Sequence, residues 1–177
     1  MRIVGGIYRG RKLNEFKGGR VRPTSDMVRE SLFNILQFKI QNKTFLDMYC
    51  GTGAVGIEAL SRGASKVTFN DFSRESLALT QSNLQRLGIT DGVQLTGKDA
   101  SAFYLTTTDK FDFIFLDPPY QDGVTDEFLD NLSTILTDDG VIIYENEVEF
   151  KGSPLKVVVA DRRKYGRAHL TFFKKGE

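Results

Sequence analysis

From residue 44 onward the chain alternates short apolar runs with longer amphipathic segments, and this alternation constrains the possible fold more than any other feature. The amphipathic segments at residues 54–62, 74–87 and 125–136 have the periodicity of helices. The apolar runs are typical of buried strands and occupy residues 45–49, 66–70, 93–96, 111–116, 141–145, 155–159 and 170–173. Strands that alternate with helices predict an α/β fold, in which helices cover both faces of a mostly parallel sheet.

The two ends of the chain depart from this pattern. Residues 2–8 and 10–13 resemble the strands of a short hairpin, and residues 25–41 have the apolar spacing of a helix. We therefore expect a basic N-terminal hairpin appendage at residues 1–23 and one catalytic domain at residues 24–177. No helical segment separates the last two strands, only a predicted loop at residues 161–167, so these strands should pair antiparallel at one edge.

Composition excludes several classes of protein. Apolar residues make up 40% of the chain, yet no run approaches the roughly 18 apolar residues of a membrane span. The N-terminus has no apolar segment of the secretory type, so a cytoplasmic location is expected. Cys50 and His169 are the only cysteine and histidine. We expect no internal disulfide and no metal site, and we interpret both residues as packing or surface residues.

Charge is distributed unevenly along the chain. Residues 1–29 hold eight Lys or Arg against two Asp or Glu, and residues 151–177 hold the same numbers, whereas the middle is acidic. Basic ends are consistent with nucleic-acid contact, although they also serve solubility alone. Side chains that suit phosphate contacts are Arg9, Arg11, Arg22, Arg29, Arg162, Arg163, Lys164 and Arg167.

A glycine-rich segment follows the first buried strand. It begins at Asp47, and Gly51, Gly53 and Gly56 have the G-x-G-x-x-G spacing between a strand and a helix. Glycines let the backbone turn tightly and approach a ligand closely. Asp71, 20 residues after Gly51, ends the second strand, where its carboxylate can accept hydrogen bonds from ribose hydroxyls. These features predict a nucleoside site but do not choose between NAD and S-adenosylmethionine.

Four further positions complete the predicted nucleoside site. Asp99 follows the third strand and can accept from an adenine amino group, or it is an ordinary loop residue. The other cofactor-binding candidates are neighbours of these acids and of the glycines, namely Tyr49, Phe72 and Ala100.

The fourth strand leads directly into Asp117, Pro118, Pro119 and Tyr120, and this tetrapeptide is the most informative segment of the chain. Two prolines end the strand and hold the backbone rigid. An exocyclic amine of a nucleobase is a poor nucleophile because its lone pair is conjugated into the ring. The carboxylate of Asp117 and the carbonyl of Pro118 can accept its two hydrogens and favour the reactive geometry. Tyr120 offers a face on which the base can stack.

These motifs resemble class I S-adenosylmethionine-dependent methyltransferases that act on amines. The segments at residues 2–13, 22–34 and 56–64 are similar to the RsmD family of ribosomal RNA guanine-N2 methyltransferases. The resemblance covers essentially the whole chain. It implies a single Rossmann-like domain with a seven-stranded sheet and one antiparallel strand, S-adenosylmethionine as cofactor, and a guanine of 16S ribosomal RNA or of a partly assembled small subunit as target. Cys50 and Thr52 stand where the family pattern leads us to expect Ala and Ser.

Other functions remain open on the motifs alone. An adenine or cytosine amino-methyltransferase acting on DNA or another RNA has the same motif residues. A nicotinamide-dependent oxidoreductase fits the glycine loop, but the sequence lacks a visible substrate domain and a histidine or lysine placed for hydride chemistry. A ribosome-binding module without catalysis is disfavoured by the intact Asp117 and by the glycines. The oligomeric state and the identity of the target guanine do not follow from the sequence.

Overall fold

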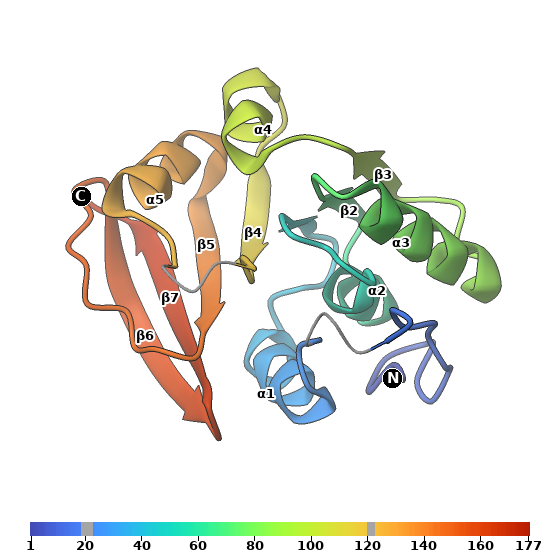
Figure 1. Cartoon of the computed structure of the whole chain (residues 1–177). Coiled ribbons are helices and arrows are strands. Elements are labelled where there is room, and N and C mark those ends of the chain that lie inside the picture. Colours follow the sequence, from blue (N-terminus) through green and yellow to red (C-terminus); the bar gives the residue numbers. More distant parts are fainter. Residues whose placement is uncertain (19–22, 120–122) are drawn as a thin grey trace.

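A computed structural model describes residues 1–18, 23–119 and 123–177. Its seven-stranded sheet has the order β3-β2-β1-β4-β5-β7-β6, and β7 runs antiparallel to the other strands (Figure 1). The strands are β1 (Thr44–Asp47), β2 (Lys66–Asn70), β3 (Val93–Thr96), β4 (Phe111–Leu116), β5 (Leu136–Asn146), β6 (Val157–Tyr165) and β7 (Ala168–Lys175). The predicted fold class is therefore confirmed, including the antiparallel pairing of the last two strands.

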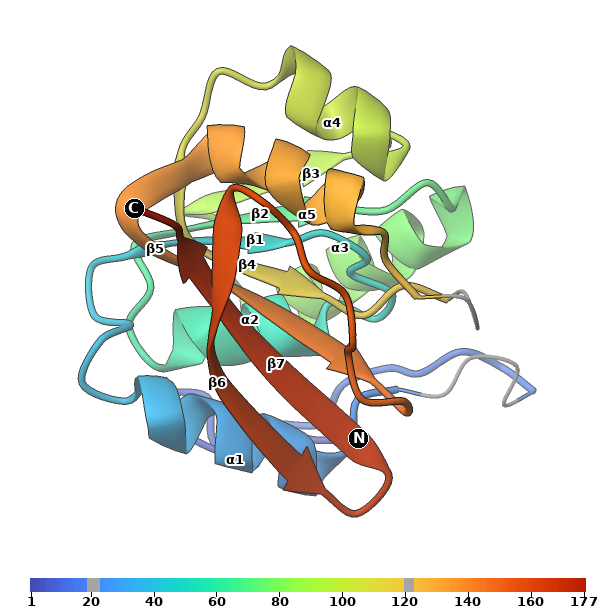
Figure 2. The ribbon, with the colours of Figure 1, turned by 90° about the vertical axis from the view of Figure 1, so that its left-hand side faces the viewer.

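Helices cover both faces of the sheet, as Figure 2 shows with α4 and α5 on one side and α1 and α2 on the other. Their bounds are α1 (Asp26–Leu36), α2 (Ala54–Ser61), α3 (Arg74–Leu87), α4 (Ala100–Thr106) and α5 (Asp126–Leu132), and a 3-10 turn, η1 (Ser133–Ile135), follows α5. Short polar side chains begin several of them: Ser25 accepts from the Val28 N–H, and Thr125 accepts from the Phe128 N–H. The parallel central strands have their carboxyl ends at the same end of the sheet. The loops that follow these strand ends form the candidate site.

The core consists of two apolar layers separated by the sheet. Successive residues of β4 alternate between them: Phe113 and Phe115 pack with α1, α2 and α3, whereas Ile114 and Leu116 pack with α4 and α5. Both layers bury nearly all of these side chains. Such burial on both faces explains why the strand sequences are continuous apolar runs rather than alternating ones.

Three local predictions were wrong. Helix α1 ends at Leu36, earlier than predicted. Residues 161–165, predicted as loop, continue β6, and only the turn at residues 166–167 separates it from β7. The predicted N-terminal hairpin has a single bridge, Arg2 to Lys12, instead of two strands. In the last two deviations, strand pairing or its absence overrides local residue preference.

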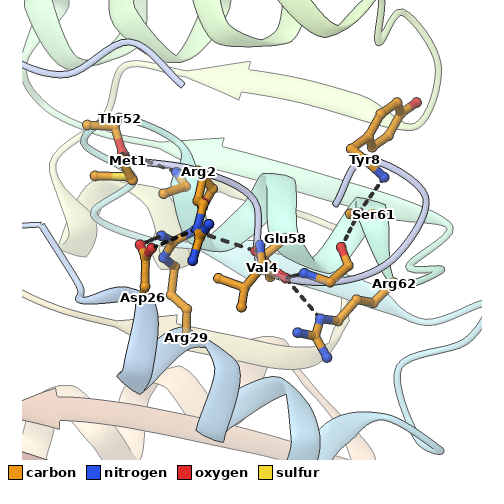
Figure 3. Close-up of polar contacts among 12 residues, drawn as sticks. Met1, Arg2, Val4, Tyr8, Asp26, Arg29, Thr52, Glu58, Ser61 and Arg62 are labelled. Atoms are coloured by element: carbon orange, nitrogen blue, oxygen red, sulfur yellow. Dashed lines mark hydrogen bonds and ion pairs between the residues drawn. The ribbon is translucent and has the colours of Figure 1, made fainter. Parts of the chain in front are cut away.

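The N-terminal segment is attached to α1 and α2 by buried charges (Figure 3). Glu58, fully buried in α2, accepts hydrogen bonds from the N–H groups of Val4 at 3.0 Å and Gly5 at 2.7 Å. The fully buried guanidinium of Arg29 lies 3.5 Å from Glu58 and donates to the carbonyl of Arg2 at 2.9 Å. Residues 1–13 thus pack into the same core as α1, and whether they form a separate appendage stays a prediction.

Across the described ranges of the chain, no helix is both long and apolar enough to cross a membrane.

Candidate active site

The turn after β1 is built around the buried carboxylate of Asp47. Its Oδ2 accepts from the Gly56 N–H at 2.9 Å and so ties the end of β1 to the first turn of α2. Gly53 precedes α2 with a φ of 81°, and a Cβ at this position would lie 2.8 Å from the Thr80 side chain. Only glycine therefore fits here without strain, because a side chain meets both an unfavourable φ and a steric clash. At the start of α2 the Ala54 N–H donates to the Thr52 hydroxyl at 3.3 Å and the Gly56 N–H donates to Asp47, so side chains of the loop already satisfy these groups.

Asp71 holds the same loop from the neighbouring strand. Its Oδ2 accepts from the Gly51 N–H at 3.0 Å, and its Oδ1 accepts from the Ser73 N–H at 2.9 Å. Each oxygen retains a second lone pair, so the carboxylate can still accept from a ligand hydroxyl. The 20-residue spacing of Gly51 and Asp71 therefore reflects a direct contact between the two loops.

The other predicted cofactor residues follow the ends of neighbouring strands. Phe72, next to Asp71, is 79% exposed and offers an open aromatic face. Asp99 is exposed and caps α4, because its Oδ1 accepts from the Ser101 N–H at 2.9 Å. Ala100 is buried as the first residue of α4, and Tyr49 is half-buried in the turn after β1. These positions are compatible with an adenosyl group, and the residues' role in binding one remains a prediction.

Two polar side chains that sequence reasoning missed support the glycine loop. Thr80, fully buried in α3, donates to the Gly51 carbonyl at 3.0 Å. Asn83, also fully buried, donates to the carbonyls of Thr52 at 2.8 Å and Asn14 at 3.1 Å. They hold the loop against α3 and the N-terminal segment. Polar residues three apart on the buried face of the helix at residues 74–87 were the available signal.

Asp117 and Pro118 are half-buried at the end of β4, beside the glycine loop. The hydroxyl of Thr24, itself only 8% exposed, lies 3.4 Å from Asp117 Oδ2 and 2.9 Å from Glu145 Oε2. Glu145 lies near the end of β5. Three segments far apart in the sequence therefore meet at this point, and sequence reasoning identified only Asp117. Tyr120 and Arg22 fall outside the described residues.

Burial gives two of the site's carboxyl groups unusual acidities. It raises the pKa of Asp117 to about 6, although the Thr24 hydrogen bond opposes the shift. Burial likewise raises the pKa of Asp47 to about 7; the Gly56 hydrogen bond opposes this, and the charges of Asp71 and Asp117 add to it. The charges of Asp71 and Asp117 act on Asp47, so these carboxyl groups give the site a negative potential where they are ionised.

Cys50 is buried as predicted, and the same burial makes it a poor nucleophile. Desolvation raises the pKa of its thiol well above the usual value, and the charge of Asp47 adds to the effect. His169 is half-buried in β7. Among the residues that the structure describes, no group of three or more His, Cys, Asp and Glu side chains could hold a metal ion.

The predicted phosphate-binding cations lie in two regions, with one exception. Arg9 and Arg11 are exposed in the N-terminal segment. Those of the C-terminal region, Arg162, Arg163, Lys164 and Arg167, are exposed along the outer strand β6 and in the turn after it. Arg29 is instead fully buried and paired with Asp26 and Glu58. The prediction of a phosphate contact for Arg29 is therefore wrong, because its charge is needed to balance Glu58 inside the protein.

Comparison with known proteins identifies relatives along nearly the whole chain. A family model described as "Conserved hypothetical protein 95" matches residues 1–174. Ribosomal RNA small subunit methyltransferase D of Escherichia coli is 35% identical over 153 residues, which cover 84% of this chain and 76% of that protein. The protein YlbH of Bacillus subtilis is 34% identical over 99% of both chains.

Solved structures agree with the sequence relatives. The yhhF protein of Escherichia coli has a TM-score of 0.86 at 30% identity, over 99% of this chain and 97% of its own. A more distant structure, complexed with SAH, has a TM-score of 0.67 at 17% identity, over 82% of this chain and 49% of its own, and shares the fold. The chain thus belongs to the family described as Conserved hypothetical protein 95, the RsmD family, which includes the ribosomal RNA small subunit methyltransferase D proteins.

Proposed function

We propose that this protein transfers the methyl group of S-adenosylmethionine to the exocyclic N2 amine of a guanine in 16S ribosomal RNA. The substrate is the RNA itself or a partly assembled small subunit. Membership of the RsmD family supports ribosomal RNA methylation as the activity. The choice of guanine N2 is the finer part of the proposal and is argued from the chemistry of the site.

One observation carries the proposal: the glycine loop and the Asp117 motif follow strands that are direct neighbours. Asp47 of β1 pairs with Phe115 of β4, so the two strands end side by side. A donor bound at the turn after β1 would present its methyl group towards a base held after β4. Transfer is an in-line displacement, in which positioning of the amine and the sulfonium methyl provides most of the acceleration.

The charge of the site favours S-adenosylmethionine over NAD. Asp71 and Asp117 are acidic groups close to Asp47, as their effect on its pKa shows. A sulfonium cation is attracted by such a potential, whereas the pyrophosphate of a dinucleotide is repelled. After transfer the sulfur is neutral, so this attraction is lost and release of the product becomes easier.

Two measurements test the proposal. Mass spectrometry of ribosomal RNA nucleosides, from cells with and without the gene, should show N2-methylguanosine only when the protein is present. Calorimetry should show binding of S-adenosylmethionine and of its demethylated product, but not of NAD. Tight binding of NAD without a response to S-adenosylmethionine contradicts the methyltransferase function. N6-methyladenine or N4-methylcytosine in DNA as the product contradicts the guanine assignment alone.

Activity should rise with pH through about 6 because Asp117 must be ionised to accept a hydrogen bond from the amine with full strength. Its pKa of about 6 is raised above the ordinary value, so the protein loses the active form as pH falls through this value. Single-turnover rates should fall about tenfold per pH unit below 6 and be independent of the Asp117 titration above about 7.

Asp117→Asn is the matched control for this titration. Its amide carbonyl still accepts a hydrogen bond but does not titrate, so the variant should keep part of its activity. The ratio of the parental rate to the variant rate isolates Asp117 from Asp47, whose pKa is near 7. A ratio that does not change between pH 5 and 8 contradicts the assigned role of Asp117.

The exposed cations of β6 support RNA as the polyanionic partner. Figure 1 shows the arrowheads of β4 and β5 on the side of the molecule where α1 and the tip of the β6–β7 hairpin also lie. Arg162 is 3.8 Å from Glu149, and Arg163 is 2.9 Å from Asp161, in pairs that are about half exposed. Exposed ion pairs contribute little free energy, so phosphates can compete for these guanidinium groups.

Replacing Arg162, Arg163 and Lys164 with alanine should weaken RNA binding and flatten its salt dependence. Each lost phosphate contact lowers the slope of log K against log salt by roughly 0.7 to 0.9. Affinities measured over a series of salt concentrations provide the slope. As a control, Lys66 and Lys110 lie near the opposite ends of β2 and β4, and their alanine variants should keep the parental slope. A parental slope in the triple variant shows that β6 does not contact RNA.

A further inference from the structure

Glu145 lies beside Asp117 at the predicted target-base site, and no motif in the sequence pointed to it. Leu116 of β4 pairs with Tyr144 of β5, so Asp117 and Glu145 are the next residues on two adjacent parallel strands. Both are half-buried. Their carboxylates approach the same Thr24 hydroxyl, at 3.4 Å from Asp117 Oδ2 and 2.9 Å from Glu145 Oε2. The site therefore contains two acidic groups where the amine chemistry by itself needs one.

The Thr24 hydroxyl orients Glu145 without exhausting its capacity to accept hydrogen bonds. A hydroxyl has one proton, and the shorter distance indicates that Thr24 donates it to Glu145. This bond uses one of the roughly four lone-pair sites of a carboxylate. Thr24 is 8% exposed, so little water competes for its proton. The bond to Thr24 therefore holds the carboxylate in position and occupies only one of these lone-pair sites.

Two adjacent hydrogen-bond acceptors match the Watson–Crick edge of guanine. They do not match the Watson–Crick edges of adenine and cytosine. Guanine carries two neighbouring donors, the N1–H and the N2 amine. Adenine and cytosine carry a ring nitrogen lone pair beside their amines, at N1 and N3 respectively, and a carboxylate repels such a lone pair. Proteins recognise a base that is flipped out of its stack through hydrogen bonds to its Watson–Crick edge. A group that must pair with a substrate N–H strongly rejects analogues that lack it.

We propose that Glu145 is a specificity-determining residue that accepts the N1–H of the target guanine, while Asp117 and the Pro118 carbonyl hold the N2 amine. Thr24 is the positioning residue for Glu145. Glu145 takes no part in bond making, because the methyl group passes directly from sulfur to nitrogen. This inference rests on the proposed guanine-N2 function and adds the residue that selects the base.

The test uses 2-aminopurine, which keeps the N2 amine but has a lone pair at N1 instead of a hydrogen. Small-subunit RNA is prepared with guanosine or 2-aminopurine riboside at the methylated position, after mass spectrometry has mapped it. The preference for guanine is the ratio of the single-turnover rate on the guanosine RNA to the rate on the 2-aminopurine RNA. It is measured for the parental protein and for Glu145→Gln. The amide of glutamine can turn its NH2 group towards N1. The preference for guanine should therefore fall by at least about tenfold in Glu145→Gln, since a hydrogen bond to a charged group is lost.

Asp139→Asn is the matched control, because Asp139 is an exposed carboxylate on the same strand near its other end. This variant should keep the parental preference. Thr24→Val, which removes the hydroxyl, should reduce the preference through Glu145. A preference in Glu145→Gln equal to the parental one overturns the inference, whatever the result for Thr24→Val. So does an equal loss of rate on both substrates in Glu145→Gln, which indicates a structural role.

The experiment gives a different result if the proposed guanine-N2 methylation itself is wrong. If the parental protein forms no N2-methylguanosine in ribosomal RNA, the proposed function is wrong before any preference is measured. If it forms N2-methylguanosine and Glu145→Gln leaves the preference unchanged, only the assignment of Glu145 is wrong.

Discussion

Replacement of Asp117 with alanine is expected to slow methyl transfer about a hundredfold to a thousandfold while donor affinity stays nearly unchanged. Loss of one fixed hydrogen-bonding group in a site shielded from water costs on the order of 2.7 to 4 kcal/mol in the barrier, by analogy with removal of one oxyanion-hole donor. The effect should appear in single-turnover rates, which report the chemical step separately from RNA binding and product release.

Donor affinity should survive because the predicted donor site is held by other residues. The glycine loop is tied by Asp47, Asp71 and Thr80, whose hydrogen bonds do not involve Asp117. Calorimetry with S-adenosylmethionine checks this point, and the midpoint of thermal unfolding checks the fold. If Asp117→Ala transfers methyl groups at the parental rate, the tetrapeptide is a structural turn and the catalytic assignment has to be abandoned.

Local patterns predicted the parts of this site that local geometry determines. Asp47 and Gly53 lie in the turn between one strand and the next helix, where close approach of the backbone requires small residues. The contact between Asp71 and Gly51 follows from the parallel pairing of β1 with β2. An apolar run and the motif after it were sufficient to predict both the turn after β1 and the position of Asp71.

The rest of the site depends on contacts between distant segments, which no local pattern encodes. Thr24 and Glu145 are 121 residues apart in sequence yet 2.9 Å apart in space. Arg29 was interpreted as a surface cation because arginines are rarely buried, but the fully buried Glu58 provides the compensating charge. β6 is a different case: its partner β7 follows directly after a tight turn, and this pairing extends the strand through Tyr165, where charged residues alone suggest a loop.

The buried ion pair of Arg29 and Glu58 leads to a prediction for stability: removing either charge should be strongly destabilising. Glu58 lies within hydrogen-bonding or ion-pairing distance of Arg29 and Arg62 and of the N–H groups of Val4 and Gly5 (Figure 3). The Nε of Arg29 has no hydrogen-bond partner, so its guanidinium depends on the contacts that remain. Removing one member of a buried pair leaves an uncompensated charge where water cannot solvate it.

Glu58→Gln should lower the free energy of unfolding by about 3 to 5 kcal/mol, which is the usual cost of breaking a buried ion pair from one side. Urea unfolding monitored by circular dichroism measures it. The N-terminal segment should be released at the same time, because the hydrogen bonds to Val4 and Gly5 weaken, and limited proteolysis near residues 1–13 should detect the release. Arg29→Met should cost a comparable amount.

An exposed pair of similar geometry provides the control that separates burial from charge. Lys66 and Asp109 are 3.1 Å apart, but about two-fifths of each side chain is exposed, so Asp109→Asn should cost no more than about 1 kcal/mol. In the double variant, Glu58→Gln with Arg29→Met, the loss should be smaller than the sum of the two single losses, because no isolated charge remains between these residues. A loss for Glu58→Gln as small as that of Asp109→Asn, or strict additivity in the double variant, would show that the buried charges do not depend on each other. The N-terminal segment would then be held by its apolar contacts, chiefly those of the fully buried Ile3.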